Sequence, residues 1–202
     1  LFKEVLLKNI GIARKNLCQH TFYLNEKTSN IMVGHGIAPP IIAEIVNCTK
    51  KSDQDIIKKV SHYIHSGADI IDIGCIANKP NSKRVKEIID LIRNNFNVLI
   101  SIDSMQKDEI FAAIKKDIDL ILSIDLGNYR EFLNIPKDIP IVLLPTKVNK
   151  GVFPKHPASR VKNLLTLTKE MQRNGFNKLI ADPLLETPIS PGICNSLQTY
   201  FL

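Results

Sequence analysis

Asparagine and aspartate side chains recur where short apolar runs of this sequence end, and these side chains are the ones best suited to bind a ligand. The set comprises Asn47, Asp72, Asp103, Asp125 and Asp182. Their amide and carboxylate oxygens accept hydrogen bonds. An aspartate at the end of a strand stays partly solvated and can be aimed at a ligand, whereas a carboxylate inside a sheet is costly to bury. The five side chains can act together only if the fold brings the ends of the runs to one place.

Short apolar runs alternate with segments of helical period along the chain. The runs with strand character span residues 41–46, 69–74, 98–103, 120–125, 141–145 and 178–182. Between them the apolar spacing predicts helices, the first capped by Ser52 or Asp53 and ended by Gly67, and a weak fourth near "NYREFL". Strict alternation of strand and helix predicts parallel strands joined by right-handed crossovers.

Parallel strands of this kind form either an open doubly wound sheet or a closed barrel. The segment after the first run, "VNCTKKSDQD", has no glycine, so it lacks the phosphate-binding loop of an open nucleotide-binding sheet. In a (β/α)8 barrel the active site is assembled from residues at the carboxyl ends of several strands. The recurrence of polar side chains at such ends therefore favours an α/β fold of the (β/α)8 TIM-barrel type.

The alternation of side chains along a strand predicts which of them face the barrel interior. If Asp103 points inward, the same alternation places Asp72 and Asp125 inward. Glu44 does not fit this register. With Asn47 inward, Glu44 falls on the helix-facing side, where a carboxylate would need a partner.

Six strands fit in the 202 residues, whereas a closed barrel has eight strands and typically about 250 residues. We therefore expect two βα units outside this sequence: either the chain is an excised portion, or the barrel is completed by sequence beyond Leu202 or by another chain. Residues 39–202 form the incomplete barrel domain. Residues 1–38 form an N-terminal extension, in which the polar turn "NEKTSN" predicts a hairpin at the barrel bottom.

The composition is that of an ordinary globular protein, 44% hydrophobic and 23% charged, with a formal net charge of +7. No apolar run approaches the ~20 residues of a membrane helix, and the N-terminus lacks the features of a signal peptide, so we expect a soluble cytoplasmic protein without membrane partners. Nucleic-acid binding is disfavoured, because the chain has no tryptophan and only four tyrosines for base stacking. The charge suits an anionic small molecule or a solvated lysine-rich surface.

Four segments carry a family resemblance. "EIVNCTKKSDQD" is similar to the pattern I-V-N-V-T-P-D-S, and "GADIIDIGCIANKP" to G-A-D-I-I-D-I-G-G-E-S-T-R-P. "ISIDSMQKDEIFAAI" is similar to I-S-V-D-T-x-K-x-x-V-A-x-x-A-L, and "LIADPLLETPI" to L-D-P-G-x-G-F-x-K. From Ile41 to Leu202 the chain thus resembles the pterin-binding barrel family, which includes dihydropteroate synthase and the methyltetrahydrofolate:corrinoid methyltransferases.

The resemblance implies that pterin is bound by aspartates. Asp103 and Asp182 would hold the amino-pyrimidinone edge of the ring, with Asp72 and Asp125 as further pterin-binding residues. The chemistry agrees, because a carboxylate can accept two hydrogen bonds from adjacent N–H groups on one heterocycle edge, and such charge-assisted bonds are geometrically selective.

A second group of residues is expected to serve a diphosphate. The resemblance assigns Asn47 and Thr49 to the first loop of the site, and Asn47 could also contact a Mg²⁺ ion. Lys147 and other basic residues fall in loops predicted at the barrel mouth, where they could attract phosphate or simply form a solvated surface. The others are Lys50, Lys51, Lys79, Lys83, Arg84 and Lys150.

The sequence also departs from the synthase pattern. The glycine-rich flexible loop, the E-S-T-R segment and the strand-six glycines are replaced by "KKSDQD", "CIAN" and "LLET". The lysine of strand seven and the arginine and histidine of strand eight have no place, because the sequence ends first. What remains resembles the synthase-related proteins of methanogenic archaea.

The implied function is that of a pterin-binding, dihydropteroate synthase-like transferase. It would join a pterin methyl diphosphate to an anionic aryl amine in the biosynthesis of tetrahydromethanopterin, a folate-like cofactor. Two alternatives stay open: a methyltetrahydropterin-dependent corrinoid methyltransferase and a non-catalytic pterin-binding domain. Any of the three could act as a homodimer.

Overall fold

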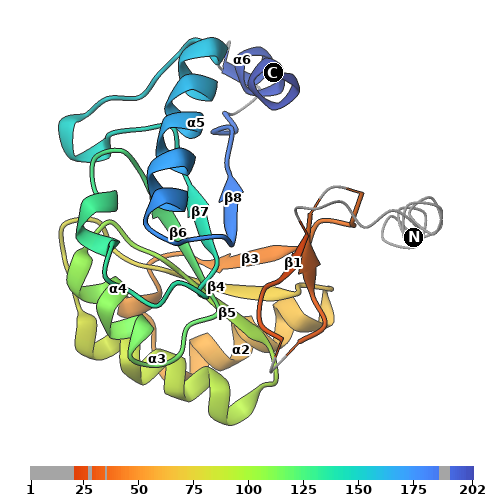
Figure 1. Ribbon diagram of the computed structural model, residues 1–202. Coiled ribbons are helices and arrows are strands. Elements are labelled where there is room, and N and C mark those ends of the chain that lie inside the picture. Colours follow the sequence, from red (N-terminus) through yellow and green to blue (C-terminus); the bar gives the residue numbers. More distant parts are fainter. Residues whose placement is uncertain (1–20, 27–28, 35, 187–191) are drawn as a thin grey trace. The chain divides into compact units, whose positions relative to one another are not determined.

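The computed structural model describes residues 21–26, 29–34, 36–186 and 192–202. The chain separates into two compact units, residues 1–119 and 120–202, and each has its own arrangement. Six parallel strands alternate with helices along the chain, three strands in each unit, and this confirms the predicted fold class (Figure 1). The six strands lie within or at the six apolar runs.

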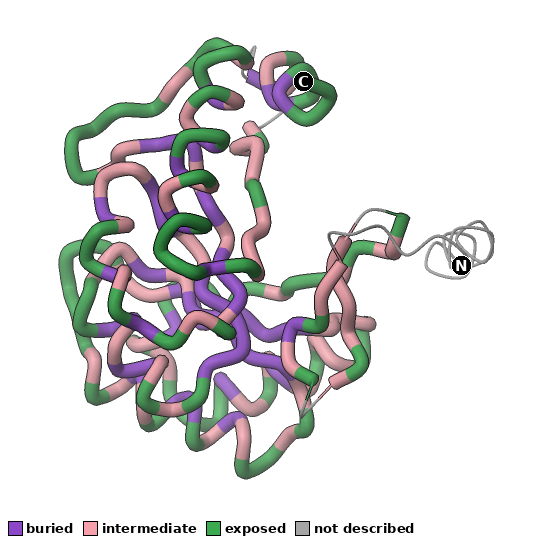
Figure 2. The backbone as a smooth tube through the Cα atoms, in the orientation of Figure 1, coloured by how far each residue is buried: buried purple, intermediate pink, exposed green. Residues whose placement is uncertain are grey.

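In the first unit, β3 (Ile42–Ile45), β4 (Ile70–Gly74) and β5 (Leu99–Asp103) form a parallel sheet in that order. The register pairs Glu44 with Asp72, Asp72 with Ser101, and Gly74 with Asp103. All five residues of β4 are buried, as Figure 2 shows along this central strand. A near-continuous isoleucine run is what a parallel strand covered on both faces requires.

Three helices follow these strands: α2 (Asp53–His65), α3 (Ser82–Asn95) and α4 (Lys107–Ile114). Ser52 caps α2, with its hydroxyl accepting a hydrogen bond from the Asp55 backbone N–H at 3.2 Å, and Gly67 follows the helix with a φ of 97°. Both positions were predicted. The apolar stripes of α2 and α3 are buried in the core and consist of Ile56, Val60, Val85, Ile88, Ile89 and Ile92.

In the second unit, β6 (Leu120–Ile124), β7 (Ile141–Leu143) and β8 (Leu179–Ala181) are parallel, with α5 (Pro157–Arg173) between β7 and β8 in sequence and α6 (Gly192–Phe201) after β8. The weak fourth helix is a single 3₁₀ turn, η3 (Tyr129–Phe132). With 17 residues, α5 is the longest described helix, and no described helix is long and apolar enough to cross a membrane.

The predicted alternation of side chains does not hold along β6. The pairing with β7 shifts register between Ile121 and Ile124, and Ser123 has a left-handed φ of 67°. An irregularity of this kind changes which way the following residues point. Because β6 is not a regular strand, simple alternation cannot be used to predict that Asp125 points inward.

Near the start of the described chain, β1 (Phe22–Tyr23) and β2 (Met32–Val33) pair antiparallel across the "NEKTSN" segment. The Asn25 side-chain amide donates to Asp119 Oδ1 at 2.5 Å, so this pair is fastened to the residue that precedes β6. It belongs to the same compact unit as β3, β4 and β5. Residues 1–20 of the predicted extension lie outside the described residues, and the domain boundary at residue 38 stays a prediction.

Candidate functional site

Three carboxylates gather on one face of the sheet in the first unit. Glu44, Asp72 and Asp103 come from β3, β4 and β5, and one oxygen of each lies within 4.8 Å of the others. We call these three residues the carboxylate face. Paired residues of parallel strands project to the same side. Since Glu44 pairs with Asp72, the prediction that Glu44 faces the helices is wrong.

The error came from extending the strand alternation to Asn47. Strand β3 ends at Ile45, and Asn47 has a left-handed backbone with φ 53° and ψ 40°, so its orientation says nothing about Glu44. Gly74 makes room for Glu44, because a Cβ at Gly74 would lie only 2.1 Å from Glu44 Oε1. The sequence did carry a signal for the correct face. Glu44 in "AEI" and Asp72 in "IDI" are each an acidic residue flanked by apolar residues within a strand, and these two segments pair in the sheet.

Asp72 is buried, with only 2% of its surface exposed, so the prediction that it stays partly solvated at a strand end is wrong. It is the third residue of β4, and Ile73 and Gly74 continue the strand beyond it. The Ser101 hydroxyl donates a hydrogen bond to Asp72 Oδ1 at 2.6 Å. Burial raises the pKa of Asp72 to about 7. The Ser101 hydrogen bond acts in the opposite direction, and the charges of Asp103 and Glu44 raise the pKa further.

Asp103 is the last residue of β5 and is half-buried, as the sequence predicted for a ligand-binding position. Its backbone carbonyl accepts a hydrogen bond from the Cys75 N–H at 2.9 Å. The pKa of Glu44 is also raised, first by burial and then by the charge of Asp103. Within the carboxylate face, the raised pKa of about 7 therefore lets Asp72 keep a proton to near-neutral pH. The cluster offers several acceptor oxygens to a ligand, and these oxygens could alternatively hold a divalent cation.

The loop after β3 carries the two residues that sequence similarity assigns to the diphosphate. Asn47 precedes the short 3₁₀ turn η2 (Cys48–Lys50), is exposed, and makes no capping hydrogen bond with its side chain. The Thr49 hydroxyl oxygen is buried and has no hydrogen-bond partner among the described residues. A buried hydroxyl without a partner is uncommon in native proteins. This loop thus contains an exposed amide that is not used for capping and a buried hydroxyl without a partner among the described residues.

Arg84, one of the basic residues predicted at the barrel mouth, is already engaged. Its Nη2 donates to the Lys51 carbonyl at 2.9 Å and to Asp53 Oδ1 at 2.6 Å, and its Nη1 lies 3.4 Å from Glu87 Oε2. Arg84 therefore holds the loop after β3 against α3. A second predicted residue, Lys83, lies 3.9 Å from Glu87 Oε1.

In the second unit, Asp125 is fully buried, and its carboxylate accepts four hydrogen bonds. Oδ1 accepts from the N–H groups of Gly127 and Asn128 at 2.7 and 3.0 Å. Oδ2 accepts from the Thr146 hydroxyl at 2.9 Å and the Val148 N–H at 2.7 Å. Since a carboxylate has about four acceptor positions, this geometry favours a brace between the loops after β6 and β7. A pterin contact by Asp125 stays a prediction.

Asp182 follows β8 directly and is half-buried, and its Oδ1 accepts a hydrogen bond from the Leu184 N–H at 2.7 Å. Lys147 precedes the 3₁₀ turn η4 (Val148–Lys150) and pairs through its backbone with Val152. Both residues belong to the second unit. Their expected action on the same ligand as Asp103 stays a prediction.

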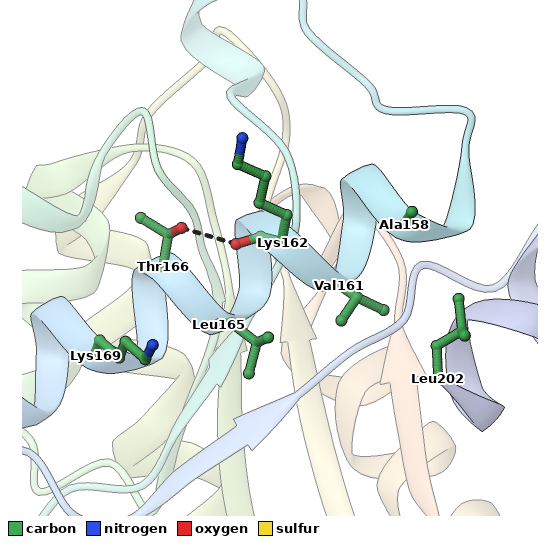
Figure 3. A pocket seen from close by; sticks show the side chains of 7 residues that line it. All are labelled: Ala158, Val161, Lys162, Leu165, Thr166, Lys169 and Leu202. Atoms are coloured by element: carbon green, nitrogen blue, oxygen red, sulfur yellow. Dashed lines mark hydrogen bonds between the residues drawn. The ribbon is translucent and has the colours of Figure 1, made fainter.

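Arg160 on α5 is a fully buried cation that sequence reasoning did not single out. It donates to the carbonyls of Pro154 and Leu184 at 2.8 and 3.0 Å. It also donates to the Ser196 hydroxyl at 3.3 Å, and its Nη2 lies 3.0 Å from Glu186 Oε1, an ion pair without hydrogen-bond alignment. Arg160 thus anchors the segment that follows Asp182. A surface hollow of about 440 Å³ along α5 is lined by residues of this helix and by Leu202, and by none of the predicted site residues (Figure 3).

The comparisons with known proteins agree with the predicted family. Residues 45–190 match the family described as "Pterin binding enzyme". An uncharacterized protein of Methanocaldococcus jannaschii is 30% identical over 175 residues, which cover 86% of this chain and 33% of that protein. Dihydropteroate synthase of Streptococcus pyogenes is 30% identical over 103 residues, 45% of this chain and 39% of the enzyme. The chain thus spans well under half the length of these relatives.

Solved structures of dihydropteroate synthases share the fold. The Coxiella burnetii enzyme in complex with pteroic acid superposes with a TM-score of 0.64 at 18% identity, over 86% of this chain and 70% of that one. The Burkholderia cenocepacia enzyme complexed with 7,8-dihydropteroate gives a TM-score of 0.61 at 17% identity, over 79% and 64% of the two chains. The six βα units therefore have the TIM-barrel fold of these enzymes over part of their length.

Proposed function

The chain belongs to the pterin-binding enzyme family, and from this premise we propose that it acts as a dihydropteroate synthase-like transferase. It would join a pterin methyl diphosphate to an anionic aryl amine in the formation of tetrahydromethanopterin or a similar folate-like cofactor. The observation that carries the proposal is the carboxylate face, in which Asp103 ends β5 beside Asp72 and Glu44.

The carboxylate face suits the amino-pyrimidinone edge of a pterin. That edge presents adjacent N–H donors and a carbonyl acceptor. The Asp103 carboxylate oxygens can accept from the donors, and charge-assisted bonds of this kind are about twice as strong as neutral ones. Asp72, whose pKa is about 7, carries a proton through much of the neutral range and can donate as well as accept. Glu44 adds a third acceptor that sequence analysis did not assign to the site.

In the proposed reaction, the amine nitrogen forms a bond to the exocyclic methylene carbon of the pterin. The bond from this carbon to the diphosphate oxygen breaks, the diphosphate leaves with the electron pair, and the amine loses a proton. Catalysis would consist of positioning the two substrates and stabilising charge on the leaving group. We assign the second task to the Asn47 amide, which is not used for capping, and to the Thr49 hydroxyl, which has no partner among the described residues.

Asn47 would also be the protein ligand of a Mg²⁺ ion. Its exposed side chain is not used for capping, so its amide oxygen fits such a role. Mg²⁺ commonly takes one or two protein oxygens together with substrate phosphates, and when bound it would neutralise charge on the diphosphate. The lysines at the same loops, Lys50 and Lys51, would favour anionic substrates over neutral ones.

Calorimetric titration with a reduced 6-hydroxymethylpterin tests the proposal, with and without diphosphate and Mg²⁺. We expect binding that diphosphate strengthens and that Asp103→Asn weakens about tenfold, since one charge-assisted hydrogen bond is lost. Asp108→Asn, an exposed change on α4, is the matched control and should leave binding unchanged.

The same titration separates the alternatives. Pterin binding that ignores diphosphate would point to methyl transfer to a corrinoid protein or to a non-catalytic binding domain. Turnover of a pterin methyl diphosphate with an aryl amine would distinguish an enzyme from a binding domain. An Asp103→Asn variant that binds pterin as the parent does would show that the carboxylate face is not the pterin site.

A further inference from the structure

We propose that Glu109 is a positioning residue for Asp103. Its buried carboxylate ties the loop after β4 to the loop after β5 and thereby fixes the end of β5 within the carboxylate face. The inference rests on the proposed function, because it takes Asp103 as a pterin-binding residue.

Glu109 is an unusual residue for its place in the fold. It lies in the first turn of α4 and is completely buried. Its neighbours Ile110, Ala112 and Ala113 on the same helix are buried apolar residues, as suits a helix packed into a core. A buried carboxylate is costly unless its oxygens are hydrogen-bonded. Glu109 should therefore make contacts that an apolar side chain could not.

Those contacts join two loops. Glu109 Oε1 accepts a hydrogen bond from the Asn81 backbone N–H at 2.8 Å. Glu109 Oε2 accepts one from the Ser104 hydroxyl at 2.5 Å, and that hydroxyl in turn accepts from the Gln106 N–H at 3.0 Å. Asn81 ends the loop after β4, where its side chain caps α3 through the Arg84 N–H. One carboxylate thus joins the last residue of the loop after β4 to the first residue of the loop after β5.

Both loops begin at the carboxylate face. Ser104 is the residue directly after Asp103, and Cys75 is the first residue after β4. The Cys75 N–H donates to the Asp103 carbonyl at 2.9 Å. Asp103 is therefore held on one side by the β4 loop and on the other by the Ser104 link to Glu109. Small displacements of a group that orients a substrate reduce binding and catalysis strongly.

Glu109 is not itself a member of the carboxylate face. Among the described residues, the three carboxylates that share an oxygen cluster are Glu44, Asp72 and Asp103. Any effect of Glu109 on pterin should then pass through Asp103, and a double-mutant cycle can measure this coupling.

The experiment is a calorimetric titration with a reduced 6-hydroxymethylpterin of four proteins: the parent, Glu109→Gln, Asp103→Asn and the double variant. We expect Glu109→Gln to weaken binding about tenfold in the parent background, because one hydrogen bond to a charged group is lost from the clamp. In the Asp103→Asn background the same change should weaken binding less than about twofold. Asp108→Asn, exposed on the same helical turn, should change nothing.

Ser104→Ala is a second variant that keeps the inference testable if Glu109→Gln does not fold. It removes only the hydroxyl that links Glu109 to β5, and its effect on pterin affinity should likewise vanish without Asp103. Two results would overturn the role of Glu109 and leave the proposed function standing. In the first, Glu109→Gln weakens pterin binding equally with and without Asp103→Asn. In the second, Glu109→Gln does not weaken binding although Asp103→Asn does. Unchanged binding by Asp103→Asn would overturn both.

Discussion

Because Asp72 is buried, we expect the free energy of unfolding to decrease as the pH rises from acid to neutral. The pKa of Asp72 is about 7 in the folded protein, against an ordinary value of 3.8. Between these two values, the folded state binds more protons at this site than the unfolded state does. The contribution of protonated Asp72 to the free energy of unfolding is therefore fully present below about pH 4. It is lost as the pH rises to about 7.

The size of the effect follows from the same two values. The interval from 3.8 to about 7 is roughly three pH units, and each unit corresponds to about 1.4 kcal/mol. Asp72 ionisation therefore removes at most about 4 kcal/mol of stability between pH 4 and pH 8. Other carboxylates contribute their own pH dependence, so the quantity to measure is the difference between the parent and Asp72→Asn. Asparagine is nearly isosteric, stays neutral, and can still accept the Ser101 hydrogen bond.

Urea unfolding at a series of pH values, in the presence of a chelator, measures this difference. We expect Asp72→Asn to be close to the parent at pH 4 and more stable by up to about 4 kcal/mol at pH 8. Carbon-13 NMR of the Asp72 carboxyl gives its titration directly. A parent and variant whose stabilities run parallel with pH, or a carboxyl that titrates near pH 4, would refute the reasoning.

Three further variants test other parts of the structure. Gly74→Ala should displace the Glu44 carboxylate and lower the pKa of Asp72, with under about 1 kcal/mol lost in urea unfolding, because the displaced atoms end a flexible side chain. A larger loss would mean that Glu44 is rigidly held. Asp125→Asn should destabilise the protein by about 2 kcal/mol, because an amide cannot accept all four hydrogen bonds. A loss of pterin affinity as great as that of Asp103→Asn would argue for a ligand role instead. Arg160→Met should cost about 3–5 kcal/mol, since it removes the ion pair with Glu186 and leaves the Pro154 carbonyl without its hydrogen bond, and unchanged unfolding would contradict the anchoring role.

The order of strands and helices could be predicted from the sequence because each element carries a local signal. Isoleucine-rich runs mark the parallel strands, and apolar stripes at helical spacing mark α2 and α3. The ends of α2 at Ser52 and Gly67 could also be predicted, because capping and a left-handed backbone depend on the residue type itself. Such features need no knowledge of distant contacts.

The parts that were missed depend on where a strand ends and on what lies across from it. Strand alternation extended from β3 to Asn47 places Glu44 on the wrong face, because β3 ends at Ile45 and Asn47 has a left-handed backbone. The two residues that follow Asp72 in β4 place it inside the sheet rather than at its end. Glu109 sits beside Ile110 on α4, and nothing in helical spacing shows that its partners are Asn81 and Ser104.

The carboxylate face destabilises the folded protein when its groups are ionised, and a ligand that donates hydrogen bonds would reduce this cost. Burial and then the neighbouring charges raise the pKa values of Asp72 and Glu44, so ionising these two groups destabilises the folded protein. A ligand that brings N–H donors stabilises the ionised carboxylates, whereas an apolar ligand does not. The Glu109 contacts with Asn81 and Ser104 tie together the loops that follow β4 and β5, the strands of Asp72 and Asp103. Acceptor oxygens gathered on one face in this way would suit a ring that donates hydrogen bonds, as the proposed pterin does.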